Sequence, residues 1–154
     1  MQQSNRDIDF LNMVYDTAQM GEKAIGFLQE KVGDQSLRGD LQTQYRQYAD
    51  ISNKVENEMG KKGKMPKQTN PVSQAGLWSG IQVNTLVNRS SDHIASMMIQ
   101  GSMMGVIEMS RALKEFSDVA QESKNLGQEL IQMEENNVQR MKQYLGDKKG
   151  EQQH

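Results

Sequence analysis

Acidic and amide side chains recur at matching positions in the two halves of this 154-residue chain. Each match starts from a Met-Gly pair, with Gly21 in the first half and Gly105 in the second. An acid follows each glycine by 29 positions, and an asparagine follows each by 32. A further glutamate lies within three positions of each glycine. The six residues are Glu22, Asp50, Asn53, Glu108, Glu134 and Asn137.

These residue types are ligands for divalent metal ions. Carboxylate and amide oxygens suit manganese, magnesium and calcium, whereas imidazole suits iron, zinc and copper. If the helices that carry the four acids all turn them inward, they line one core site. The alternative is that helical drift turns some of them to the surface, where acids are ordinary. Asn53 and Asn137 are then either weak oxygen ligands or buried side chains that hydrogen-bond across the core.

Other site chemistries have few residues to support them. The sequence has no cysteine, which excludes disulfides and thiolate catalysis. His93, the one histidine not at the chain end, lies beside Asp92 at a predicted helix start and has no nucleophile paired with it. The five methionines from Met97 to Met109 can ligate Cu(I) as thioethers. Successive helix positions point in different directions, however, which favours core packing or a partner-binding surface.

The spacing of apolar residues predicts four long amphipathic helices and no strand. They span about residues 7–32, 35–59, 92–116 and 118–145. The first two and the last two are joined by short connections, whereas residues 60–70 form a basic loop with Gly and Pro breaks. Residues 71–90 predict an extra helical segment, which either continues into the third long helix or breaks near Ser90-Ser91, where Ser91 or Asp92 caps the continuation.

Each helix should bury one stripe of residues spaced three or four apart. In the first two helices the stripes are Leu11, Val14, Ala18, Gly21, Ile25, Leu28 and Val32, and Leu37, Leu41, Tyr45, Tyr48, Ile51, Val55 and Met59. In the other two they are Ile94, Met98, Gly101, Gly105, Glu108 and Ala112, and Val119, Leu126, Leu130, Met133, Asn137, Met141 and Tyr144. Gly101 and Gly105 each cost about 1 kcal/mol relative to alanine in a helix, so we expect another backbone to approach there.

Four helices with two short connections and one long one predict an all-α, up-down-down-up bundle with a crossover. The arrangement of acids resembles the ferritin-like, rubrerythrin-like superfamily of four-helix bundles over about residues 7–145. The segment LWSGIQ after the crossover also looks like that of small uncharacterised bacterial ferritin-like proteins.

Members of this superfamily hold two iron or manganese ions with a Glu on two helices and Glu-x-x-His on the other two. The resemblance implies that Glu22 and Glu108 stand at the single-Glu positions. It also implies that Asp50-x-x-Asn53 and Glu134-x-x-Asn137 stand at the Glu-x-x-His positions. Because asparagine replaces both histidines, the expected protein is a bundle without a standard di-iron centre.

The remaining features of the sequence predict one domain over residues 7–145, with disordered ends at residues 1–6 and 146–154. The formal net charge of −2 gives no reason to expect a nucleic-acid partner. No apolar run is long enough to span a bilayer, and MQQSNRDIDF lacks the layout of a signal peptide, so a cytoplasmic location is expected.

Three functions follow from this sequence. The first is a non-enzymatic structural or partner-binding bundle, homo-oligomeric or bound to another protein through the methionine-rich third helix, with no cofactor. The second is a metal-binding protein for Mn or Fe, in storage or oxidative stress, that uses Glu22, Asp50, Glu108 and Glu134. The third, supported only by the tripeptide Trp78-Ser79-Gly80, is a small secreted helical interaction protein.

Overall fold

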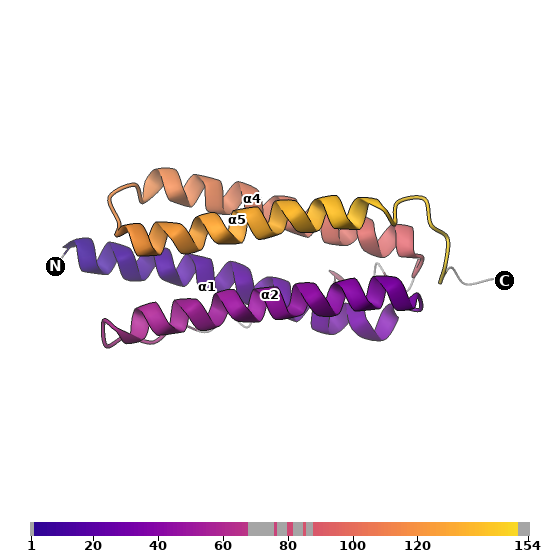
Figure 1. Ribbon diagram of the computed structural model, residues 1–154, viewed down its shortest axis with the longest axis horizontal. Coiled ribbons are helices and arrows are strands. Elements are labelled where there is room, and N and C mark those ends of the chain that lie inside the picture. The colour runs from indigo at the N-terminus through magenta and orange to yellow at the C-terminus, as the bar shows by residue number, and fades with distance from the viewer. Residues whose placement is uncertain (1, 68–75, 77–79, 82–84, 86–87, 151–154) are drawn as a thin grey trace.

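Four long helices pack side by side in a computed structural model that describes residues 2–67, 76, 80–81, 85 and 88–150 (Figure 1). They are α1 (Gln2–Leu28), α2 (Gln35–Gly60), α4 (Ser91–Glu115) and α5 (Gln121–Lys142), and the short 3-10 helix η1 (Gln29–Lys31) follows α1. The described residues contain no strand. The all-α four-helix bundle predicted from the apolar spacing is therefore confirmed.

The order of the helices is up-down-down-up. The short connections make α1 antiparallel to α2 and α4 antiparallel to α5, while α2 and α4 run in the same direction (Figure 1). The chain therefore leaves α2 at one end of the bundle and enters α4 at the other. The extra helical segment predicted over residues 71–90 lies largely outside the described residues. None of the helices in the described part combines the length and apolar character that crossing a membrane requires.

Polar side chains set the starts of two helices. Asp34 has an extended backbone and accepts a hydrogen bond from the Leu37 backbone N–H at 3.0 Å, which caps the start of α2. Ser90 is also extended, with ψ of 153°, and accepts from the His93 N–H at 3.1 Å. The third long helix therefore has its own start at Ser91, and the cap is Ser90 rather than Ser91 or Asp92.

The N-terminal residues are more ordered than the sequence predicts, because α1 already begins at Gln2. Arg6 makes an ion pair of 2.8 Å with Asp118, and its guanidinium lies 4.7 Å from the centre of the Phe116 ring. These contacts tie the first turns of α1 to the connection between α4 and α5.

The last helix begins at Gln121, three residues later than predicted, because its cap comes from a different helix. The Asp7 carboxylate of α1 is buried and accepts from the Ala120 N–H at 2.7 Å. A cap supplied by a residue 113 positions away leaves no signal in the local sequence.

Residues 146–150, part of the predicted C-terminal tail, lie against the start of α4. The backbone carbonyls of Lys149 and Asp147 accept from the N–H groups of Ser91 and Asp92, both at 2.8 Å. Gly146 makes the turn with φ of +85° and donates its N–H to the Asp92 carboxylate at 2.7 Å. The returning chain thus satisfies two of the free N–H groups at the start of α4.

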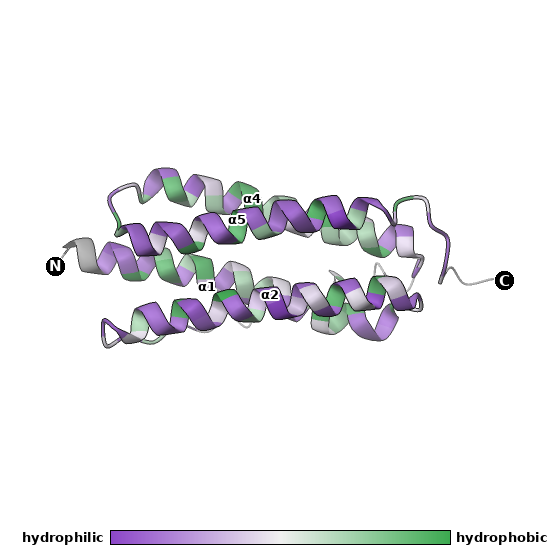
Figure 2. Ribbon diagram, viewed as in Figure 1, coloured by the Kyte–Doolittle hydropathy of each residue, from purple (hydrophilic) through white to green (hydrophobic). Residues whose placement is uncertain are grey.

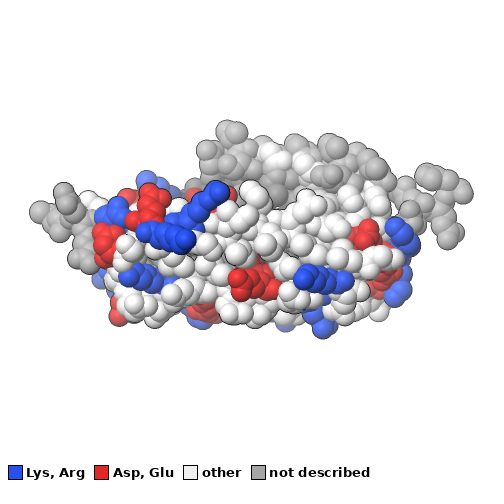
Figure 3. All heavy atoms as spheres, turned by 90° about the horizontal axis from the view of Figure 1, so that it is seen from above, with Lys and Arg blue, Asp and Glu red and all other residues white. Residues whose placement is uncertain are grey.

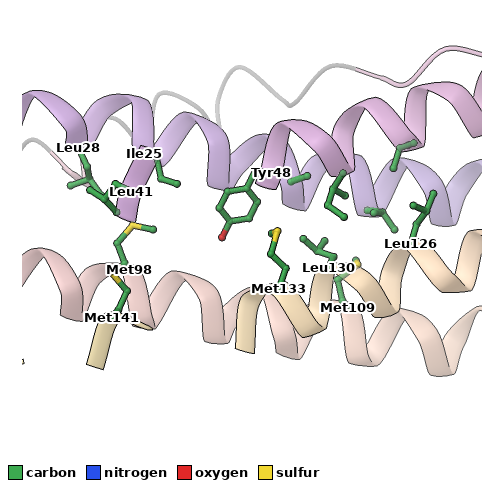
Figure 4. Packing of buried hydrophobic residues seen from close by; sticks show 14 of the residues in the cluster. Ile25, Leu28, Leu41, Tyr48, Met98, Met109, Leu126, Leu130, Met133 and Met141 are labelled. Atoms are coloured by element: carbon green, nitrogen blue, oxygen red, sulfur yellow. The ribbon is translucent and has the colours of Figure 1, made fainter. Parts of the chain in front are cut away.

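The core lies along the axis of the bundle, with the apolar faces of all four helices turned toward it (Figure 2). All of the large apolar residues of the predicted stripes are buried except Tyr45, which is 38% exposed. Near the middle, Tyr48 reaches from α2 between one group of apolar side chains around Leu28 and Met98 and another around Leu130 and Met133 (Figure 4). At this midpoint Tyr48 meets two of the buried polar residues, Ser102 and Glu134.

Candidate functional site

The six predicted metal-ligating residues do not converge. Glu134 and Asn137 of α5 are buried, with 2% and 5% of their surfaces exposed. Glu22 is half-buried, and the remaining three are exposed: Asp50, Asn53 and Glu108. The prediction that Glu108 belongs to the buried stripe of α4 is wrong. At about 100° per residue, Met109 lies within about 40° of the buried Ser102 and Gly105, whereas Glu108 lies about 120° from Ser102, and Met109 is the residue that fills the core there.

Two of the outward acids have partners of their own. Asp50 pairs with Lys54 at 3.1 Å, and the same ammonium group binds Glu129 of α5 at 2.6 Å. Glu22 accepts a hydrogen bond from Gln19 at 3.1 Å. Within the part of the chain that the structure describes, no three acidic or histidine side chains lie close enough to hold a metal ion. The four-carboxylate site expected from the sequence is not assembled.

A different polar cluster occupies the centre of the bundle and joins three helices. The Tyr48 hydroxyl of α2 donates a hydrogen bond to Oε1 of Glu134, and the Ser102 hydroxyl of α4 donates to the same oxygen at 3.2 Å. The sequence interpretation missed Ser102. Its spacing from Met98 and Gly105 places it on the buried stripe of α4, and that spacing is the signal that could have identified it.

The two glycines of the internal repeat make room for this cluster. A Cβ atom on Gly21 of α1 would lie within 2.7 Å of Cε2 in the Tyr48 ring. One on Gly105 of α4 would lie 3.2 Å from Cδ of Glu134 and closer still to its Oε2. The expected close approach is therefore made by a side chain and not by a second backbone. At Gly101, no atom of the described residues lies within 4 Å of the position that a Cβ atom would take, so the described part of the chain shows no close approach there.

Burial in the bundle changes the acidity of Glu134. It raises the pKa of this carboxyl to about 7, and the hydrogen bonds from Tyr48 and Ser102 offset only part of the effect. Burial and the neighbouring carboxylate also raise the pKa of Tyr48 well above 10, so the phenol stays protonated and remains a donor. Near neutral pH, Glu134 therefore exists as a mixture of the charged and neutral forms.

A cavity of about 480 Å³ opens between α1 and α4 and reaches this cluster. Its described lining includes Tyr48, Ser102 and Glu134, together with two further acids, Asp16 and Glu108. No lysine, arginine or histidine is among the described lining residues. The walls are otherwise mostly apolar, with methionine side chains and the backbone of the glycines, and include Met20, Met97, Met98, Met104, Gly21, Gly101 and Gly105.

Asn137, a candidate ligand or hydrogen-bonding residue of the core, has one amide atom without a partner in the described part of the chain. Its Nδ2 atom is buried and has no partner in the part of the chain that the structure describes. Gln44 is buried on α2, and its Nε2 and Oε1 atoms also have no hydrogen-bond partner among the described residues. Neither residue is among those that line the cavity between α1 and α4.

Comparison with known proteins supports the fold and gives no information about the activity. No family model and no curated protein sequence matches this chain. Among solved structures, it is similar to a crystal structure of a DUF305 fragment from Deinococcus radiodurans, with a TM-score of 0.67. The alignment covers 92% of this chain and 95% of that one at 13% sequence identity. A similarity at this level shows that the two chains share their helical fold.

Proposed function

We propose that this chain is a non-enzymatic, ferritin-like bundle that acts by binding a partner and has no standard di-iron centre. The observation that carries the proposal is the divergence of the acids. Glu134 is buried at the centre, whereas Asp50 and Glu108 are exposed and Glu22 is half-buried. A buried metal ion needs several ligands that converge on one point, and here a tyrosine and a serine occupy the neighbourhood of the buried carboxylate.

The first prediction concerns metal content. Protein purified without chelator, and again after addition of Fe(II) and Mn(II) under nitrogen, should contain no stoichiometric metal by elemental analysis. Its thermal midpoint should not rise with either ion, because an ion bound only to the folded state would raise it. One or two tightly held ions per chain that are lost in Glu134→Gln and retained in Glu135→Gln would instead establish the metal-binding function.

The outer face of α4 is the surface that supports partner binding. Met103 and Ile107 are each 42% exposed, and Met104 between them is 58% exposed. Figure 3, which looks onto the side of the bundle that α4 and α5 form, shows uncharged surface over much of this side, with charged groups toward both ends and also near the middle. Contiguous exposed apolar side chains of this kind are typical of protein interfaces. A second copy of the chain is the partner that we propose.

The second prediction tests this partner. The wild-type chain should form dimers or larger oligomers in sedimentation velocity at micromolar concentration. The double variant Met103→Glu/Ile107→Glu should be monomeric, because it places two charges in an apolar contact. Met65→Glu is the matched control, since Met65 is 86% exposed in the connection after α2 and lies away from α4's outer face. A monomeric wild-type protein, or a double variant that still associates, would contradict the proposal.

A further inference from the structure

Glu134 offers one carboxylate oxygen to the cavity between α1 and α4. Both hydrogen bonds from Tyr48 and Ser102 end on Oε1. In the part of the chain that the structure describes, no donor reaches Oε2, which lies on the side of Gly105. Only 2% of the surface of Glu134 is exposed, and the residue lines the cavity. An acceptor so placed is available to a bound molecule.

The charges around the cavity favour a cation. Asp16 of α1 and Glu108 of α4 line it together with Glu134, and the described lining includes no basic side chain. Tyr48, the other ionisable group that faces Glu134, is neutral and donates a hydrogen bond to Oε1. A buried carboxylate without a cation is costly, so a bound ammonium group would gain both a hydrogen bond and a charge partner there.

The apolar lining of the cavity favours a ligand whose cationic group is attached to an apolar part. Four methionines line the cavity, and methionine adapts to ligands of irregular shape. Gly101 also lines the cavity, and among the described residues no atom lies within 4 Å of the position that its Cβ would take. The volume of about 480 Å³ falls within the range of pockets that hold small organic molecules.

We infer that this cavity binds a small primary amine with an apolar body, whose ammonium group donates to Oε2 of Glu134 while its apolar part lies against the methionines of α1 and α4. The site adjoins the proposed dimer surface, because Met104 belongs to that surface and also lines the cavity, whereas Met103 and Ile107 are not among the described lining residues. The Met103→Glu/Ile107→Glu variant should therefore still bind octylamine, which separates the two tests.

Three eight-carbon probes test the charge requirement at equal length: octylamine, octanol and octanoate. Titration calorimetry at pH 8, where Glu134 is mostly ionised, should detect octylamine binding at least about tenfold tighter than octanol, with no binding of octanoate. Glu134→Gln should remove the preference for the amine. Glu135→Gln, which removes an exposed acid at the next position of α5, should keep it. Equal affinity for octylamine and octanol in the wild-type protein would overturn the inference.

A second pair of variants tests the location without changing any charge. Gly101→Leu puts a side chain into the open part of the cavity and should abolish octylamine binding. Gly39→Leu is the matched control, because Gly39 is also an exposed helical glycine with nothing within 4 Å of its Cβ position and lies on α2. Methyl NMR signals of Met98 and Met104 should shift on binding, and that of Met65 should not. Unchanged binding by Gly101→Leu would overturn the inference.

Discussion

Alanine at position 105 should lower the free energy of unfolding by about 2 kcal/mol, whereas alanine at position 101, one turn earlier, should raise it by about 1 kcal/mol. Both substitutions exchange the same residue types within the same helix, α4. Helix propensity alone predicts that both variants become more stable. The opposite sign at position 105 comes from the neighbours of the new methyl group.

At position 105 the new Cβ would meet the buried carboxyl group of Glu134, with Cδ at 3.2 Å and Oε2 closer. The carboxyl group cannot swing away freely, because Oε1 accepts hydrogen bonds from Tyr48 and Ser102. Relief of the clash therefore breaks buried hydrogen bonds, which costs more than the gain in helix propensity. At position 101 the methyl group meets no atom of the described residues within 4 Å, so we expect the propensity gain alone.

Urea denaturation of the two single variants measures both effects. A double-mutant cycle identifies the cause: in a Glu134→Ala background, which removes the carboxyl group, Gly105→Ala should lose its penalty. If Gly105→Ala were as stabilising as Gly101→Ala in the wild-type background, the packing of Glu134 against α4 described above would be wrong.

The second large effect is a pH dependence of stability that belongs to Glu134. Its pKa is about 7 in the folded protein, against 4.5 for an ordinary glutamate. Between these values the folded state holds a proton that the unfolded chain has released. The contribution of Glu134 to the free energy of unfolding is therefore greatest below about pH 4.5, and it falls as the pH rises toward 7. At about 1.4 kcal/mol per pH unit, the total loss is about 3 kcal/mol.

Glu134→Gln should remove this contribution, because glutamine does not titrate and can still accept from Tyr48 and Ser102. Relative to the wild-type protein, the variant should gain about 2–3 kcal/mol of stability between pH 5 and pH 8, measured as the difference between the two urea profiles. The pH profile of the free energy of unfolding of Glu135→Gln should run parallel to that of the wild-type protein. If the profile of Glu134→Gln also ran parallel to that of the wild-type protein, the pKa of the Glu134 carboxyl group would not be raised by folding.

The amino-acid sequence by itself determined the four helices and the order in which they pack. Runs such as Leu11 to Val32 and Leu37 to Met59 repeat at three and four positions, and this spacing is a local property of an α-helix. Asp34 signals the start of α2 because a cap acts within three residues of itself. Connection lengths then decide which helices are antiparallel neighbours. These parts of the fold depend on interactions between residues close in the sequence.

The tertiary structure alone decided which polar residues face one another. Asp50 and Glu134 hold the same position in the repeat, yet one is exposed and the other is buried, because the rotation of each helix about its own axis decides which of its positions face the core. The meeting of Tyr48, Ser102 and Glu134 depends on how three helices are rotated and shifted against one another. The same packing fills the space at Gly105 and leaves it open at Gly101. The spacing of residues along one helix therefore does not predict which side chains of another helix will contact it.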